Sequence, residues 1–251
     1  MDITVDLHTH SVASGHAYST VLELAHAGAA RGFEAIAITD HGPGLPQGPH
    51  PFHFSNQSRF AYLRTPCCIL SGVEDDLSGP DGQLYLSEPL LKQLDVVLVG
   101  VHPYGWAATA SHAEIQRSLL RAMERPQVKG VTHPVNAWVE LDVKEIVRHA
   151  AATDTAVELN MSKIVGLEPR LRQFLEWVRA FDAPLMINSD AHCAGEVGLF
   201  NGLDHFAELI DPARVVNHSL AATVAFFEIH RDDVRARCRQ RAASVANSGE
   251  P

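Results

Sequence analysis

The segment Ile3-Thr4-Val5-Asp6-Leu7-His8-Thr9-His10 joins a short, strand-like apolar run to two histidines that stand two positions apart. Alternate side chains of a strand point to the same face, so His8 and His10 should leave the chain on one side. Two imidazoles on one side can bind one metal ion. Alone, this pattern is weak evidence, because polar residues commonly end a strand.

Six further short apolar runs follow along the chain, and helix signals separate several of them. A capping box formed by Thr20 and Glu23, for example, begins a helix that Gly32 should end. The runs are nearly continuous in hydrophobicity, as expected of parallel strands that are covered on both faces. Strands that alternate with helices predict βαβ units, and we therefore expect an α/β barrel. The expected strands are 3–7, 35–39, 68–73, 96–101, 128–132, 156–159 and 184–188.

Histidines and carboxylates stand at the ends of these runs or just beyond them. The candidate metal ligands are His8, His10, His16, His41, Glu74, His102, His133, Asp190 and His192. Because barrels of this class build their active sites at the C-terminal ends of the strands, these side chains should meet on one rim. A lone histidine in such a place is more often a hydrogen-bonded core residue. The recurrence of the placement favours a centre with more than one metal ion.

Glu74 ends the third run, where a lone carboxylate would be costly to bury. A carboxylate that bridges two cations avoids that cost, whereas a surface salt bridge is the alternative. Glu158 and Asn160 end the sixth run, and we expect them to hold metal-bound histidines by hydrogen bonds. Of Asp75 and Asp76, we expect one to support the site or to be solvated.

Residues 42–65 interrupt the alternation with a stretch rich in proline and glycine. We predict a long functional loop, in which His50 and His53 either contact a substrate or pack within the loop. Lys163 and Arg170 are the nearest downstream cations. They are weak candidates for phosphate contacts, and a solvated surface position is the favoured alternative.

Length and charge limit the classes of protein that fit. The chain has 251 residues and a net charge of −10, which suits one large domain and argues against nucleic acid as a partner. We predict one barrel domain over residues 1–244 and a flexible tail over residues 245–251. No stretch has the character of a signal peptide or a membrane span, and the four cysteines form no CxxC pair. We therefore expect reduced cysteines, a cytoplasmic protein and no membrane partner.

The ordered motifs HxH, SGH, TDH, GVE, GVH, THP and SDAH resemble those of the PHP (polymerase and histidinol phosphatase) family of phosphoesterases. The similarity covers roughly residues 2–230 and is greatest to the stand-alone YcdX-type phosphatases. It implies a distorted seven-stranded β/α (TIM-like) barrel. It also implies a trinuclear metal centre at the C-terminal rim of that barrel.

The resemblance further implies how the ligands divide among three divalent ions. One ion would be bound by His8, His10, Glu74 and Asp190. A second would share Glu74 as a bridge and be bound by His102 and His133. The third would be bound by His16, His41 and His192. Zinc is the metal expected first, with manganese and iron as alternatives.

These observations predict a metal-dependent phosphatase that hydrolyses small phosphate monoesters through a metal-activated water. Glu74, Asp190 and His192 are the expected catalytic residues. The leaving alkoxide would be stabilised by a metal or protonated by a group such as His192 or Asp190. An amidohydrolase-type C–N hydrolase is one alternative, although Glu74 stands where such enzymes usually carry a carboxylated lysine. A non-catalytic metal-binding barrel is another. The sequence does not determine the natural substrate. It also does not determine the oligomeric state, for which a homo-oligomer is one option.

Overall fold

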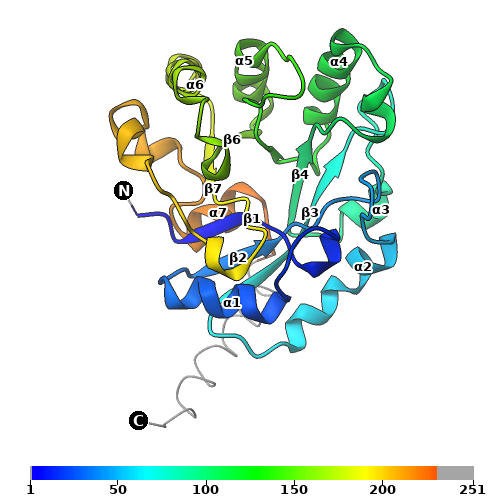
Figure 1. Ribbon diagram of the computed structural model, residues 1–251, viewed down its shortest axis with the longest axis vertical. Coiled ribbons are helices and arrows are strands. Elements are labelled where there is room, and N and C mark those ends of the chain that lie inside the picture. The colour runs from blue at the N-terminus through cyan, green and yellow to red at the C-terminus, as the bar shows by residue number, and fades with distance from the viewer. Residues whose placement is uncertain (1, 231–251) are drawn as a thin grey trace.

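The computed structural model describes residues 2–230, and its seven strands form one parallel sheet in chain order (Figure 1). Each strand pairs in parallel with the next one along the chain. This confirms the predicted seven-stranded α/β barrel. The strands are β1 (Val5–Thr9), β2 (Ala35–Ile38), β3 (Cys68–Asp76), β4 (Val96–Gly100), β5 (Gly130–Val131), β6 (Ala156–Asn160) and β7 (Leu185–Asn188).

The barrel closes between β1 and β7 through a few bonds rather than a regular ladder. Thr9 and Ala191 form an isolated parallel bridge, beside which His10 N donates to Ala191 O at 2.8 Å. Further down the seam, the amide of Asn217 donates to Val5 O at 2.8 Å and to Ile187 O at 2.7 Å. A side chain thus satisfies backbone carbonyls that a regular strand pair would satisfy itself.

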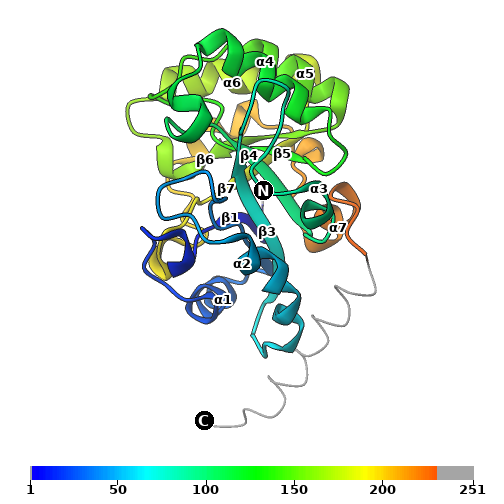
Figure 2. The same ribbon diagram turned by 90° about the vertical axis from the view of Figure 1, so that its right-hand side faces the viewer.

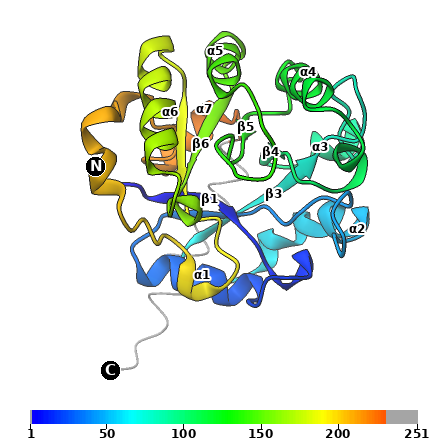
Figure 3. The ribbon, with the colours of Figure 1, turned by 45° about the horizontal axis from the view of Figure 1, so that its top comes forward.

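Helices lie outside the strands (Figures 2 and 3). They are α1 (Val21–Ala30), α2 (Pro51–Ser55), α3 (Glu88–Leu91), α4 (His112–Met123), α5 (Val143–Thr153), α6 (Glu168–Phe181) and α7 (Leu220–Phe226). The predicted capping box of Thr20 and Glu23 begins α1, and Gly32 follows its end with a φ of +83°. None of the helices in the described part of the chain is long and apolar enough to cross a membrane.

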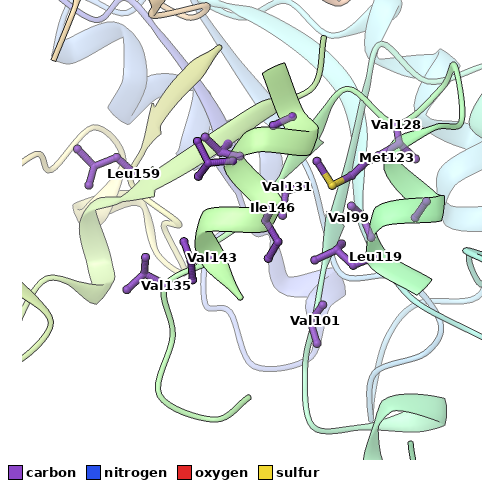
Figure 4. Close-up of a cluster of buried hydrophobic side chains, with 14 of the residues drawn as sticks. Val99, Val101, Leu119, Met123, Val128, Val131, Val135, Val143, Ile146 and Leu159 are labelled. Carbon is purple, nitrogen blue, oxygen red and sulfur yellow. The ribbon is translucent and has the colours of Figure 1, made fainter. Parts of the chain in front are cut away.

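The main hydrophobic core lies between the strands and helices α4, α5 and α6 (Figure 4). Val99 from β4 and Val131 from β5 pack in one cluster with Leu119 from α4 and Ile146 from α5. All four side chains are almost completely buried. Each such burial stabilises the fold by roughly 1.5–3 kcal/mol. The apolar runs are continuous because the other face of the strands also packs against buried side chains inside the barrel.

A bulge in β1 decides which side chains of the opening segment face the rim. The register of β1 against β2 advances three residues from Asp6 to Thr9 while β2 advances two, from Ile36 to Ile38. Val5 and Leu7 pack with the cluster inside the barrel. The extra residue shifts the alternation, so that His8 and His10 also point inward, above that cluster.

Several predicted boundaries are wrong. Strand β3 continues to Asp76 instead of ending at 73, because Asp75 and Asp76 are buried and hydrogen-bonded rather than solvated. Strand β5 is only two residues long. Residues 42–65 are not an irregular loop throughout, since they contain α2 and the 3-10 helix η2 (Asn56–Tyr62). The predicted tail over residues 245–251 lies outside the described residues, as does the end of the predicted domain.

The cysteines depart in part from the expectation of reduced thiols. Cys193 is free, whereas Cys68 is disulfide-bonded. The prediction of four reduced cysteines is therefore wrong at Cys68, because spacing along the chain does not tell which residues a fold brings together.

Candidate metal centre

His8 and His10 leave the bulged end of β1 into the rim of the barrel, and both are completely buried. The Nδ1 of His8 lies 2.8 Å from Glu158 Oε1, and the Nδ1 of His10 lies 3.2 Å from Ser14 Oγ. Each ring is thus held through Nδ1, which turns its Nε2 toward the middle of the site. There the Nε2 of His8 is 3.2 Å from Glu74 Oε2.

Glu74 lies at the centre of the cluster and is completely buried. Its Oε2 is 2.9 Å from His41 Nδ1, and its Oε1 is 2.8 Å from His133 Nε2. Burial alone would raise the pKa of this carboxyl, but the charges of His8, His102 and other histidines hold it well below the usual value. Gly100 leaves room for the group, since a Cβ there would come within 2.8 Å of Oε1.

Asp190 follows β7 and has a φ of +51°, a conformation that costs a non-glycine residue energy and is common at functional sites. Its Oδ1 lies 3.2 Å from His10 Nε2. Its Oδ2 accepts from Asn160 Nδ2 at 3.1 Å and pairs with Lys163 Nζ at 3.2 Å. The carboxylate therefore contacts His10 with one oxygen and Asn160 and Lys163 with the other.

His102 and His133 follow β4 and β5, with ring centroids 5.0 Å apart. The Nδ1 of His102 lies 3.0 Å from Asp76 Oδ1. Burial lowers the pKa of His102, but Asp76 and Glu74 outweigh it and raise that pKa to about 9. His133 has a φ of +28°, and its backbone N donates to Glu158 Oε2 at 2.8 Å.

His16, His41 and His192 gather at the more open edge. The Nε2 atoms of His16 and His192 are 3.1 Å apart, and the ring centroids of His16 and His41 are 5.0 Å apart. Burial and the neighbouring His41 and His192 lower the pKa of His16. Neutral imidazoles that face one another in this way present lone pairs to a common point.

The donor set fits metal ions. Four buried polar atoms that face the centre lie close to one another or to Asp190, but none of them makes a hydrogen bond of acceptable geometry: His8 Nε2, His10 Nε2, His41 Nδ1 and Glu74 Oε2. Leaving such atoms without a partner is costly, and cations among them would remove the cost. Three groups have ligand atoms within 4.8 Å of one another: His8, His10 and Glu74; His41, Glu74 and His102; and His10, His41 and His192.

The first of these groups falls within one ligand set expected from the resemblance, and the other two combine members of different sets. All nine predicted ligands nevertheless lie in one cluster, linked by the contacts described above and by close ring packing, such as 4.3 Å between the centroids of His10 and His41. How many ions bind, and how the ligands divide among them, stays a prediction.

Supporting residues that sequence reasoning missed surround Asp40, which is completely buried. Asp40 accepts from Ser14 Oγ at 2.7 Å and from Ser11 N at 2.7 Å. The hydroxyl of Ser14 also accepts from His41 N at 3.2 Å and touches the ring of His10. The signal in the sequence was the acidic residue directly before His41.

The remaining candidate residues fall into those that reach the site and those that do not. His53 Nε2 lies 2.9 Å from Asp40 Oδ2, so α2 is tied to the rim through this contact. His50 accepts from Phe52 N at the start of α2, which is a structural role. Lys163 reaches the site, whereas Arg170 donates to Asn136 O at 2.8 Å and lies outside the cavity lining. Glu158 contacts His8 as expected, whereas Asn160 donates to Asp190 and not to a histidine.

A cavity of about 340 Å³ opens over the cluster. Besides five of the candidate histidines and Asp190, its wall contains Leu45, Pro46, Gln47, Tyr104, Trp138 and Lys163. A space of this size suits a small molecule.

Comparison with known proteins places the chain in a family. Residues 6–125 match the PHP domain. A "probable phosphatase" of Syntrophotalea carbinolica is 40% identical over 229 residues, which cover 88% of this chain and 95% of the relative. The chain belongs to the PHP family. A second "probable phosphatase", from Photobacterium profundum, is 34% identical to this PHP protein over 208 residues, covering 81% of this chain and 84% of the relative.

Solved structures support the fold of this PHP protein. The histidinol phosphate phosphatase of Lactococcus lactis, in complex with zinc, L-histidinol and phosphate, has a TM-score of 0.53 at 16% identity, covering 86% of this chain and 95% of that one. A putative histidinol phosphatase of Listeria monocytogenes has a TM-score of 0.52 at 14% identity, covering 80% and 99%. These structures support the fold alone, and the predicted family is confirmed by the domain match and the curated relatives.

Proposed function

We propose that this PHP protein is a metal-dependent phosphatase that hydrolyses small phosphate monoesters at a centre of three divalent ions. The observation that carries the proposal is the set of buried, unpartnered nitrogen and oxygen atoms directed at one another beneath an open cavity. The names of the curated relatives support the reaction class. Zinc is the first expectation because imidazole dominates the ligand set, with manganese and iron as alternatives.

The residues that would hold the ions are His8, His10, Glu74 and Asp190 for one, Glu74, His102 and His133 for a second, and His16, His41 and His192 for the third. When bound, such ions neutralise phosphate oxygens and lower the pKa of water. Glu74 would keep its negative charge throughout, as its lowered pKa requires. Glu158 and Ser14 would orient His8 and His10 through their Nδ1 atoms.

Charge at the open side suits a phosphate group. Lys163 lines the cavity with its Nζ beside Asp190, where it can donate to a phosphate oxygen. Asp190 and His192 were the expected proton donors for the leaving alkoxide. The Nδ1 of His192 is engaged with Asp190 O at 2.9 Å, so a metal on its Nε2 would leave it no free proton. We therefore assign both residues to metal binding, with Lys163 or water as the source of the proton.

The substrate that we propose is small. The net charge of −10 opposes a long polyanion away from the metals, whereas a monoester needs only the rim and the cavity above it. An amidohydrolase-type reaction is less well supported, because Lys163 pairs with Asp190 at the edge and Glu74 occupies the middle of the site.

The test is hydrolysis of p-nitrophenyl phosphate by protein loaded with zinc, manganese or cobalt. We expect turnover that a chelator abolishes and that added metal restores. Single- and double-stranded DNA, tested at equal enzyme and salt, should react far more slowly. Efficient nuclease activity without monoesterase activity would refute the proposal, and hydrolysis of cyclic amides alone would favour the amidohydrolase alternative.

A further inference from the structure

Two aromatic side chains line the cavity over the metal centre and remain open to it. Tyr104, two residues beyond His102, is 48% exposed, and Trp138, on the segment after β5, is 36% exposed. Leu45 and Pro46 add apolar surface to the same wall. Large apolar side chains that gather in a cavity rather than scatter over the surface mark a place where a ligand is bound.

The ring of Trp138 is fixed in place. Its Nε1 donates to Val101 O at 2.8 Å, and its backbone N donates to Asn136 Oδ1 at 3.1 Å. The ring lies nearly parallel to that of His102, with 14° between the planes and 6.1 Å between the centroids. A rigid aromatic surface loses little conformational entropy when a ligand packs against it.

Charge in the cavity wall belongs to the candidate ligands and to Lys163. Among the residues that line it, Lys163 is the charged side chain beyond the candidate ligands, and its amine is 3.2 Å from Asp190. The cation therefore lies on the side where the phosphate would bind. Tyr104 and Trp138 themselves offer no charge to match an ionised leaving group, and they offer flat aromatic surface instead.

We propose that Trp138 and Tyr104 form a leaving-group subsite that selects phosphate monoesters of alcohols carrying an uncharged planar ring. The inference rests on the proposed phosphatase function. During hydrolysis the bond between phosphorus and the ester oxygen breaks, water oxygen bonds to phosphorus, and a proton passes to the released alcohol. The subsite holds the ring of that alcohol and leaves the reacting atoms to the rim.

Matched substrates test the inference without any mutation. The esters 2-phenylethyl phosphate, 2-cyclohexylethyl phosphate and n-butyl phosphate have leaving alcohols of similar acidity, so differences in kcat/KM report binding of the organic group. We expect the phenyl ester to be preferred over the cyclohexyl ester by about 2- to 10-fold, the range for aromatic packing beyond simple area burial. The preference should arise mainly in KM. Equal values for the two ring-bearing esters would overturn the assignment to planar rings.

Variants then locate the preference. Trp138→Leu should remove it, whereas Trp138→Phe should keep part of it. Tyr62→Leu is the matched control, because Tyr62 is an exposed aromatic residue that does not line the cavity. An unchanged phenyl preference in Trp138→Leu, with normal metal content, would contradict the role of this residue.

A binding measurement separates this inference from the proposed function. The non-hydrolysable 2-phenylethylphosphonate should change tryptophan fluorescence and bind more tightly than 2-cyclohexylethylphosphonate to the metal-loaded protein. Binding with this preference but without hydrolysis of any monoester would refute the phosphatase proposal and keep the subsite. Hydrolysis of all three esters without any preference, together with equal phosphonate affinities, would refute the subsite and keep the phosphatase.

Discussion

The rim of the barrel and the core beneath α4 and α5 are equally buried but differ in what their side chains require. In the core, Val99, Leu119 and Ile146 have no polar atoms, and removing them from water is favourable by itself. At the rim, Glu74 and His8 are also completely buried, yet each has a polar atom without a hydrogen-bond partner. The core therefore stabilises the fold unaided, whereas the rim is stable only with cations or protons among its ligands.

Replacing the central carboxylate should disturb the rim most. Glu74→Gln keeps the shape but removes the charge that holds neighbouring cations, so we expect activity to fall by orders of magnitude. Metal should be lost and the melting temperature should drop. Turnover, elemental analysis and thermal unfolding measure the three effects.

Asp75→Asn is the matched control for Glu74→Gln. Asp75 is the next residue on β3 and points to the opposite face. Burial raises its pKa to about 7, so a neutral side chain is already well populated there at neutral pH. Full metal content and normal turnover in Glu74→Gln would show that Glu74 is not a ligand.

A smaller effect is expected when the hydroxyl of Ser14, which contacts both His10 and His41, is removed. Ser14→Ala removes the group between Asp40 and His10, and we expect metal affinity to fall about 10- to 100-fold. Ser11→Ala also loses a hydrogen bond to Asp40, but Ser11 does not contact the ring of a candidate ligand. The metal affinity of this control variant should therefore change little. Equal affinities of the two variants, measured by competition with a chelating dye, would argue against this role of Ser14.

Protons should compete with metals at the rim but not in the core. Burial lowers the pKa of His8, yet Glu158, Glu74 and Asp190 outweigh it and raise that pKa well above its ordinary value in the metal-free protein. His8 therefore binds a proton at neutral pH that a metal must displace. Metal affinity should rise with pH, by about tenfold per unit for each proton released. Calorimetry at pH values from about 6 to 8 checks this, and a flat profile would contradict it.

A substitution in the core should lower stability and leave metal binding unchanged. Leu119→Ala should lower the free energy of unfolding by about 2–5 kcal/mol, because it leaves a cavity among fully buried side chains. Metal stoichiometry of the folded protein should not change. Denaturant unfolding and elemental analysis test the two parts, and loss of metal from folded Leu119→Ala would show that the two regions are coupled.

The sequence was most informative where the chemistry recurs along the chain. The alternation of apolar runs and helix signals predicted the barrel, and the histidines and carboxylates that recur at the ends of the runs predicted the nine residues that gather at its rim. The bulge that turns His8 inward could not be predicted, because it depends on the pairing of β1 with β2. The contact between His53 and Asp40 could not be predicted either, because it depends on the position of α2 and no sequence pattern connects the two residues. Trp138 gave no signal beyond its place after His133.

The number of metal ions tests the account most directly. Gently purified protein, incubated with zinc or manganese and freed of excess metal, can be measured by elemental analysis and native mass spectrometry. We predict about three ions per chain, and His41→Ala should lower the occupancy of one site, because it removes one of nine ligands. Fewer than one ion per chain after incubation would contradict the metal centre, and with it the explanation of the unpartnered atoms at the rim.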